Sequence, residues 1–489
     1  MSDTTPAISK DSAIAIIGGG FAGICAAIRL LEAGFGNITV YERARGFGGV
    51  WRANTYPGAA CDVPSRLYSY SFAPKGDWSA AYAAQPEILD YLEQVARSHD
   101  VASRLRTGHT LTAARWNASH ARWDLRFANG KVASAAALVM ATGQLSEPAM
   151  PALAGAERFG GALFHSSVWP AKFVPHGKTI VCLGTGASAI QYNPELVRTA
   201  KAVHIVQRSP SYILPKPNPP RSGENVSGLG LLRHRFKRWL LRALLDARYG
   251  IMRRGSLVAA IAKWQARRHL DRAGLDPATR AAVWPDYEIG CKRVLLSNDY
   301  YPALTRDNVH VHCREVVRLE RECAVFADGR QVPCDAVICG TGFRSTQFLE
   351  KIDVSGVKGV AIHDAWADGA RAYRGVLTAG FPNLFLLYGP NTNLGHNSIV
   401  YMIEAQVDFL LSCLARAERR GAAALQVRAP AEERDAQWVQ ERLRRTAWAS
   451  DCSSWYKNAQ GRITNNWAGT AKAYAKRLRR VDERDLIFH

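Results

Sequence analysis

The chain has 489 residues, of which 47% are hydrophobic, so it can form well-packed cores and is long enough for two or three domains. This composition excludes a disordered or fibrous protein. The formal net charge of +21 leaves a nucleic-acid or membrane partner open, and the positions of the charges must decide between them.

A glycine-rich turn near the N-terminus stands between two short apolar segments. Residues 13–17 predict a strand, residues 38–41 predict a second one, and a helix to about Leu31 lies between them, after the turn Gly18-Gly19-Gly20-Phe21-Ala22-Gly23. In such a βαβ unit Gly18 permits the tight turn, Gly20 lets a pyrophosphate approach, and Gly23 lets the helix pack on the strand. The N–H groups that begin the helix, near Phe21 and Ala22, can then bind phosphate.

An acidic residue closes this first unit. Glu42 follows the second predicted strand, 19 residues after Gly23. A carboxylate at this place hydrogen-bonds ribose hydroxyls and disfavours a 2′-phosphate. The first unit is therefore predicted to bind FAD or NAD.

The same pattern recurs about 165 positions later. Residues 179–183 and 203–207 predict two strands, and the turn between them reads Gly184-Thr185-Gly186-Ala187-Ser188-Ala189. Instead of an acid, Arg208 and Ser209 follow the second strand. A cation there suits a 2′-phosphate and predicts NADP(H), although an ordinary surface arginine is the alternative. Two such units in one chain indicate electron transfer between a flavin and a nicotinamide.

The basic residues are concentrated in one stretch. Residues 221–280 contain 14 Lys and Arg against 4 Asp and Glu, and they follow a proline-rich linker at 210–220. Apolar residues at helical spacing alternate with basic ones and predict a helical insertion over 221–287: Leu229, Leu232, Phe236, Trp239 and Leu240, with Arg233, Arg235, Lys237 and Arg238. We expect a solvated basic face over a substrate cavity, with weak membrane-surface contact through the basic helices at 229–270 as the alternative. Because no recognition motif accompanies the charge, no specific nucleic-acid partner is expected.

Two further short strands have similar ends. Residues 138–140 lead into Ala141-Thr142-Gly143, and residues 336–339 lead into Gly340-Thr341-Gly342. Together with the glycine-rich units, they predict an α/β fold of two doubly wound, Rossmann-like dinucleotide-binding domains with a helical insertion. The boundaries predicted for the first domain are 1–150 and 343–489, and those for the second are 151–220 and 288–342.

The ten cysteines form no C-x-x-C pair and no regular framework, which indicates a reducing compartment and mostly buried free thiols. Four glycines interrupt the apolar residues 13–31, so we expect neither a signal peptide nor a membrane span. The resulting predictions are a cytoplasmic location and no metal site.

Two longer motifs carry a family resemblance. Residues 159–170, from Phe159 through His165 to Trp169-Pro170, fit the pattern F-x-G-x-x-x-H-x-x-x-W-[PD]. Residues 48–62 fit G-G-x-W-x-x-x-x-[FY]-P-G-x-x-x-D. On these motifs the chain resembles the type I Baeyer–Villiger flavin monooxygenases, and the tracts 61–72 and 388–406 look most similar to the hydroxyacetophenone monooxygenase branch.

The resemblance implies an FAD- and NADPH-dependent enzyme that converts a ketone to an ester or lactone with O2, through a C4a-peroxyflavin. It places the active-site arginine on Arg293 and the carboxylate beside it on Asp62, and both are predicted to be catalytic. A fixed cation suits the peroxide anion and the oxyanion of this reaction, because arginine does not lose its proton near neutral pH. It assigns Lys292 to the 2′-phosphate beside Arg208. The remaining cofactor contacts that it implies are Arg43, Val50, Trp51, Tyr68 and Asn397.

Three other functions compete with this interpretation. A protonated flavin peroxide would oxygenate amines or sulfides instead of ketones. A flavin reductase or disulfide oxidoreductase is less consistent, because it would not need Arg293 and because Cys25 and Cys61 make no close redox pair. A basic nucleic-acid- or membrane-binding protein without enzymatic activity would leave both cofactor motifs unexplained.

Overall fold

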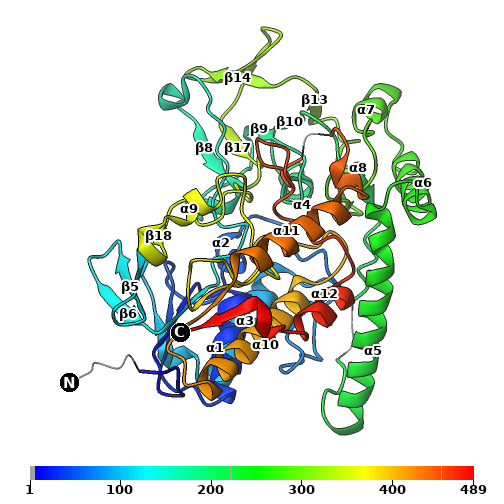
Figure 1. The fold of residues 1–489 in the computed structure, drawn as a ribbon. Helices are drawn as coiled ribbons and strands as arrows, with labels where there is room; N and C mark the ends of the chain where they lie inside the picture. The colour runs from blue at the N-terminus through cyan, green and yellow to red at the C-terminus, as the bar shows by residue number, and fades with distance from the viewer. Residues whose placement is uncertain (1–5, 221–222, 453) are drawn as a thin grey trace.

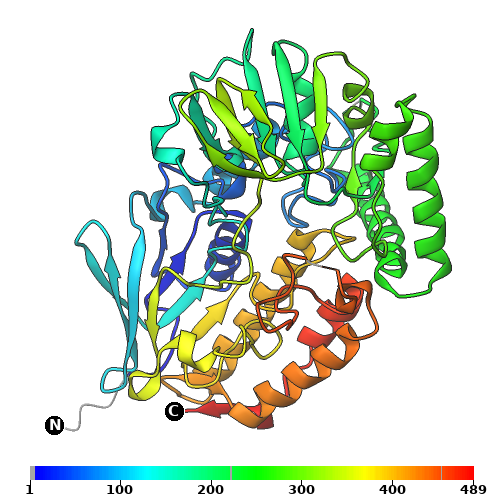
Figure 2. The same cartoon turned by 90° about the horizontal axis from the view of Figure 1, so that it is seen from above.

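Two five-stranded parallel sheets organise the chain in this computed structural model, which describes residues 6–220, 223–452 and 454–489 (Figure 1). Each sheet contains one glycine-rich βαβ unit, and an additional helical segment lies at one edge of the molecule (Figure 2). The predicted fold class is thus confirmed. Residues 1–5, 221–222 and 453, which fall within three of the predicted domain segments, lie outside the described residues.

The first sheet combines strands from both ends of the chain. Its spatial order is β19 (Leu384–Leu386), β7 (Ala137–Met140), β1 (Ile14–Ile17), β2 (Ile38–Tyr41) and β3 (Leu105–Arg106). Every residue of β1 and β7 is buried, as expected for parallel strands that are covered on both faces. Because β19 pairs with β7, the segment after residue 343 returns to the sheet on which the chain began.

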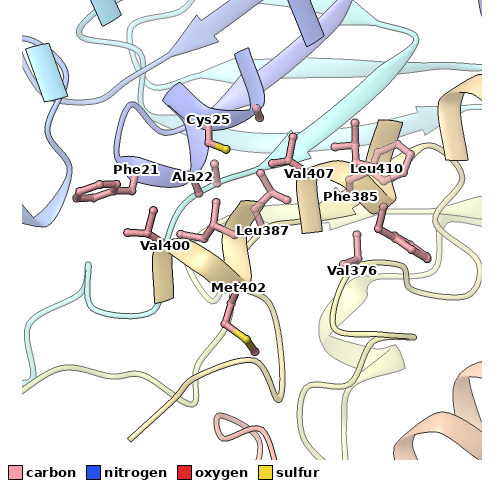
Figure 3. Close-up of a cluster of buried hydrophobic side chains, with 14 of the residues drawn as sticks. Phe21, Ala22, Cys25, Val376, Phe385, Leu387, Val400, Met402, Val407 and Leu410 are labelled. Carbon is pink, nitrogen blue, oxygen red and sulfur yellow. The ribbon is translucent and has the colours of Figure 1, made fainter. Parts of the chain in front are cut away.

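Helix α1 (Phe21–Glu32) is almost entirely apolar and packs against α10 (Ile399–Arg419). Figure 3 shows Phe21, Ala22 and Cys25 of α1 beside Val400 and Val407 of α10, in one buried cluster. Helix α10 also contacts α12 (Ala471–Leu478). This packing holds the N-terminal end of α1 in place beside the first glycine turn.

The second sheet repeats the architecture of the first. Its spatial order is β13 (Val309–His312), β10 (Ala202–Val206), β9 (Thr179–Leu183), β17 (Ala336–Cys339) and β8 (Ala162–His165). Helix α4 (Ala189–Leu196) follows β9 directly. In both sheets the strand before the glycine turn lies between the next strand of the unit and a strand from later in the chain. This switch of strand order opens a crevice at the carboxyl ends of the strands, where ligands bind.

Two smaller sheets, antiparallel except where β18 runs parallel to β4, and further helices complete the two halves. A four-stranded sheet contains β18 (Asp353–Ser355), β4 (Leu111–Asn117), β5 (Arg122–Phe127) and β6 (Val132–Ala135). A three-stranded sheet contains β14 (Val316–Leu319), β15 (Cys323–Phe326) and β16 (Gln331–Pro333). Helices α3 (Gln85–Ser98) and α11 (Ala429–Leu443) belong to the first half.

The two chain segments that connect the halves are bonded to each other. The N–H of Ala149 donates to the carbonyl oxygen of Gly342 at 2.9 Å, and the N–H of Arg344 donates to that of Glu147 at 2.9 Å. His165, the histidine of the 159–170 motif, has its Nε2 2.9 Å from the same Gly342 oxygen. The outgoing and returning segments therefore run as one antiparallel ribbon.

The helical insertion lies between two short paired strands, β11 (Ile213–Leu214) and β12 (Leu295–Leu296), and contains α5 (Gly228–Ala247), α6 (Leu257–Asp271) and α7 (Pro277–Ala282). The expected solvated basic face is wrong for Arg238, which is buried on the inner side of α5. Within the described residues, no helix has both the length and the apolarity that crossing a bilayer requires.

The expectation of free thiols needs a correction at one pair. Cys291 and Cys452, 161 positions apart, form a disulfide that joins the Lys292-Arg293 segment to the C-terminal part of the chain. Six of the eight free cysteines are buried, as expected. The cytoplasmic location stays a prediction.

Candidate active site

The first glycine turn fits a dinucleotide phosphate because side chains are excluded from it. Gly18 has φ +109°, and a Cβ there would lie 2.5 Å from the carbonyl oxygen of Ala141, at the end of β7. A Cβ at Gly23 would lie 1.8 Å from the Gly18 oxygen. No side chain caps the N-terminus of α1, so its N–H groups are available to an anion.

Glu42 is buried beside this turn. Its carboxylate accepts hydrogen bonds from the backbone N–H of Gly19 at 2.6 Å and of Ala44 at 2.8 Å. These bonds fix its position and leave further lone pairs for ribose hydroxyls. The arrangement fits FAD, which has no 2′-phosphate on its adenosine.

The predicted flavin neighbours gather around α2 (Val50–Ala53). A Cβ at Gly49, which precedes this helix, would lie 3.0 Å from the Cα of Gly20, so the start of α2 lies directly against the phosphate turn. The Trp51 indole donates to the Tyr68 hydroxyl at 3.2 Å, and the ring of Phe21 lies 5.0 Å from that of Tyr68. The structure thus brings these aromatic residues together beside the first turn.

The second glycine turn has the same geometry. Gly184 has φ +102°, and a Cβ there would lie 2.5 Å from the carbonyl oxygen of Gly340, at the end of β17. Gly186 has open space around it, Ala187 is exposed, and Ser188 precedes α4 without capping it. The Thr185 hydroxyl donates to the Ser209 carbonyl oxygen at 3.4 Å, which ties the turn to the end of β10.

Two cations meet at the end of β10. The Lys292 ammonium donates to the Ser209 hydroxyl at 2.5 Å. Burial lowers the pKa of Lys292, and the nearby charge of Arg208 lowers it further, which places the two cations close together. Among the described residues, the exposed Arg208 has no carboxylate partner. Such a pair of cations fits a 2′-phosphate and therefore NADP.

Arg293 and Asp62 form the central ion pair. The Arg293 guanidinium donates to one oxygen of Asp62, Oδ2, from Nε at 3.0 Å and from Nη2 at 2.5 Å. The side chains are 27% and 23% exposed, so the pair is shielded but reachable. The charge of Asp62 raises the pKa of Arg293. Burial alone would raise the pKa of Asp62, but Arg293 outweighs it and lowers that pKa. The site therefore holds a permanent cation.

Three residues near this pair were not singled out from the sequence. Tyr388 and Tyr456 lie within electrostatic range of Arg293, and burial raises the pKa of Tyr456 to about 12. Lys216 lies near Asp62, and burial lowers its pKa. Tyr388 has φ +56°, a strained value for a tyrosine that no sequence pattern reveals. For Lys216, the sequence signal was only a single lysine in a proline-rich linker.

Two predicted cofactor residues have other partners. Arg43 donates to the Glu147 carboxylate at 2.6 Å and to the Ser146 carbonyl oxygen at 2.7 Å. The side-chain amide of Asn397 donates to the Asp246 carboxylate at 2.8 Å and to the Arg242 carbonyl oxygen at 3.1 Å. The Asn397 side chain thus holds α5 in place, and any contact of Asn397 with a cofactor would use its backbone.

Comparisons with known proteins agree with this geometry. The model of the family "Flavin-binding monooxygenase-like" matches residues 11–362. A Baeyer–Villiger monooxygenase of Pseudomonas aeruginosa is 38% identical and covers 98% of this chain and 92% of its own. One of Streptomyces coelicolor is 37% identical, with 96% and 91% covered.

Solved structures show the same architecture. A steroid monooxygenase bound to NADP superposes with a TM-score of 0.86 at 28% identity, covering 98% of this chain and 99% of its own. The complex of OTEMO with FAD and NADP gives 0.88 at 26% identity, with 99% and 100% covered. This chain therefore belongs to the flavin-binding monooxygenase-like family and, within it, to the FAD- and NADPH-dependent Baeyer–Villiger monooxygenases.

Proposed function

We propose that this chain oxidises a ketone to an ester or lactone, consuming NADPH and O2, at a site centred on Arg293 and Asp62. The observation that carries the proposal is their ion pair, which fixes a guanidinium in a partly buried position between the two nucleotide-binding halves of the chain. Residues 1–150 and 343–489 would bind FAD, and residues 151–220 and 288–342 would bind NADP, with 221–287 as the insertion. The tracts 61–72 and 388–406 support a place near the hydroxyacetophenone monooxygenases.

In this proposal FAD, reduced by NADPH, supplies the activated oxygen. Arg293 donates hydrogen bonds to the oxygen of the ketone carbonyl as negative charge develops on it. A fixed donor in a shielded site stabilises such charge more strongly than water does, because it needs no reorganisation. Asp62 holds the guanidinium in orientation and balances its charge while the substrate is absent. Since the pKa of Arg293 is raised, no proton is lost from it in the working range.

Cofactor selectivity would come from the charges beside the two glycine turns. Arg208, Ser209 and Lys292 would hold the 2′-phosphate, whereas Glu42 would hold the ribose of FAD. Opposite charges at equivalent positions of the two units would thus select FAD in the first unit and NADP in the second. Lys292 and Arg293 are consecutive, so one short segment would contact both the nicotinamide cofactor and the reacting carbonyl.

The purified, FAD-loaded protein should be mixed with NADPH, 18O2 and a panel of aryl, cyclic and long-chain ketones, with one sulfide and one amine. An ester or lactone that contains one 18O atom is the expected product. A sulfoxide or N-oxide as the only oxygenated product would contradict the ketone proposal and favour N- or S-oxygenation. Folded, FAD-loaded protein that oxidises no NADPH would contradict the proposal as a whole.

A further inference from the structure

Most of the buried residues of helix α5 are polar or charged. Its buried positions are His234, Arg238, Arg242, Leu245 and Asp246. Arg238 donates to the carbonyl oxygens of Arg66 at 2.6 Å and Ser69 at 2.7 Å, and Arg242 pairs with Asp246 at 2.8 Å. These contacts fasten the charged side of the helix to the body of the protein.

The opposite side of α5 is apolar and faces away from the protein. Its exposed residues recur at steps of three and four along the helix, so they form one stripe: Leu229, Leu232, Phe236, Trp239, Leu240 and Leu244. Leu229 is 85% exposed and Phe236 is 62% exposed. A helix that turns leucine, phenylalanine and tryptophan outward reverses the usual orientation of a surface helix.

Helix α6 likewise exposes large apolar side chains, and most of the residues that it buries are small. Its buried positions are Ala259, Ala262, Ala266 and Leu270, whereas its exposed apolar positions are Leu257, Val258, Ile261 and Trp264. Ten of the seventeen large hydrophobic residues that are exposed in the described part of the chain lie on α5 and α6. Both helices stand at the same edge of the molecule (Figures 1 and 2). We call these ten residues the outer helical face.

The charges around the outer helical face are positive. Arg233, Arg235, Lys263 and Arg268 are exposed among its apolar residues. The only acidic residues on the two helices are Asp246, which is buried, and Asp271, which pairs with Arg267 at 3.3 Å and Arg280 at 2.5 Å. An approaching partner therefore meets apolar side chains with unneutralised cations beside them.

We propose that the outer helical face docks onto the surface of an anionic phospholipid bilayer, with its apolar side chains in the interface and its cations on the lipid phosphates. Aromatic and leucine side chains flanked by Arg and Lys are the features of helices that lie in a membrane interface. A second copy of this chain fits less well, because it would bring like charges together without an acidic counterpart. The proposal goes beyond the oxygenation reaction, since no residue of the catalytic pair takes part.

The test uses the FAD-loaded protein and sedimentation of vesicles of phosphatidylcholine alone or with about 30% phosphatidylglycerol. Protein should partition to the anionic vesicles at least about tenfold more strongly than to the neutral ones, because each cation near an anionic surface strengthens binding severalfold. Raising the salt to about 0.5 M should weaken this binding, since it screens the charges but leaves the apolar contact.

Two double variants separate the apolar and charged parts. Phe236→Ser/Trp239→Ser and Arg233→Gln/Arg235→Gln should each reduce binding to anionic vesicles by about tenfold or more. The matched controls are Val132→Ser/Val174→Ser, exposed apolar residues elsewhere, and Arg321→Gln/Arg330→Gln, exposed cations elsewhere. All four variants should keep the flavin absorbance and NADPH oxidation of the wild type, because none touches the cofactor sites.

Equal partitioning to both kinds of vesicle, or equal losses in the controls, would overturn the proposal. So would a concentration-dependent dimer that Phe236→Ser/Trp239→Ser converts to monomer in the absence of lipid, because the outer helical face would then serve self-association.

Discussion

The two hydrogen bonds that Arg293 donates to Asp62 end on the same carboxylate oxygen, Oδ2, at 3.0 Å from Nε and 2.5 Å from Nη2. Among the described residues, Nη1 of Arg293 has no hydrogen-bond partner. The carboxylate therefore fixes the plane of the guanidinium and leaves one NH2 group for another ligand. This is the donor that we assign to the ketone oxygen.

Replacing Arg293 should separate NADPH consumption from ester formation. In Arg293→Ala we expect bound FAD and NADPH oxidation to persist, while ester formation falls about 10²-fold or more, as for the loss of one oxyanion donor. NADPH loss, hydrogen peroxide and ester should be measured in the same reaction. Arg293→Lys keeps the charge but loses the two-bond geometry, so it should recover only part of the yield.

Asp62→Asn tests the orienting role in the same assay. The variant keeps the size of the side chain but removes its charge, so the yield of ester per NADPH should fall less than in Arg293→Ala. Arg254→Ala, at an exposed arginine on the surface of the insertion, serves as the control. Full ester yield in Arg293→Ala would contradict the catalytic role assigned to Arg293.

The cations at the end of β10 should determine the choice of nicotinamide. Arg208→Ala and Lys292→Ala should each raise KM for NADPH by about 10- to 100-fold, because each removes a charge-assisted hydrogen bond to the 2′-phosphate. KM for NADH, which lacks this phosphate, should change little. Steady-state kinetics with both cofactors would show this, with Lys201→Ala as an exposed control in the same domain. Parallel increases for both cofactors would instead indicate damage to the fold.

The Cys291–Cys452 disulfide should make stability depend on the redox state. A disulfide typically stabilises a protein by about 2–4 kcal/mol, so a thiol reductant should lower the melting temperature of the wild type. It should not lower that of Cys452→Ser, whereas Cys313→Ser, at an exposed free thiol, should respond like the wild type. Alkylation of Cys291 and Cys452 without prior reduction would show that the thiols are free in solution.

Glu432 should make the protein less stable as the pH rises. Burial raises the pKa of its carboxyl to about 7, and the charges of Glu433 and Asp435 also raise it. The hydrogen bond from the Ala379 N–H and the charge of Arg371 lower this pKa but do not outweigh burial. An unfolded glutamate titrates near ~4.3, so the folded chain holds an extra proton between about pH 4 and 7. The free energy of unfolding should therefore fall through this window, by about 3 kcal/mol in all.

Glu432→Gln removes this titration while keeping an acceptor for the Ala379 N–H. The variant should be more stable than the wild type at pH 8 and about equally stable at pH 4, as measured by denaturant unfolding. Glu441→Gln, at an exposed glutamate of the same helix that does not act on the Glu432 pKa, should leave the pH profile unchanged. Equal stability of wild type and Glu432→Gln at pH 8 would contradict the raised pKa.

The parts of the fold that depend on local geometry could be predicted from the sequence. The predicted strands at 38–41 and 179–183 coincide with β2 and β9, and that at 203–207 differs from β10 by one residue at each end. Gly18 and Gly184 could be assigned to tight turns from the sequence, because no side chain fits against the neighbouring strand end. The approach of Arg293 to Asp62 could not come from local pattern, because 231 residues separate them, and it required the family motifs.

What could not be predicted depends on the three-dimensional environment. The periodicity of α5 separates an apolar side from a charged side but does not say which one meets the protein, and the carbonyl oxygens that bind Arg238 come from residues 66 and 69. The pairing of Cys291 with Cys452 has no signature in their spacing. The hydrogen bond from the Asn397 amide to the buried Asp246 likewise has no signature in the sequence.

The antiparallel ribbon between the two halves restricts how they can move relative to each other. Two separate tethers would allow shear as well as rotation, whereas segments clamped at Ala149, Gly342 and His165 bend and twist as a single strap. The Cys291–Cys452 disulfide links the same two halves beside Arg293, so the halves are joined at the strap and again next to the catalytic pair. Nicotinamide would then have to enter, and product to leave, while the two halves stay joined at both places.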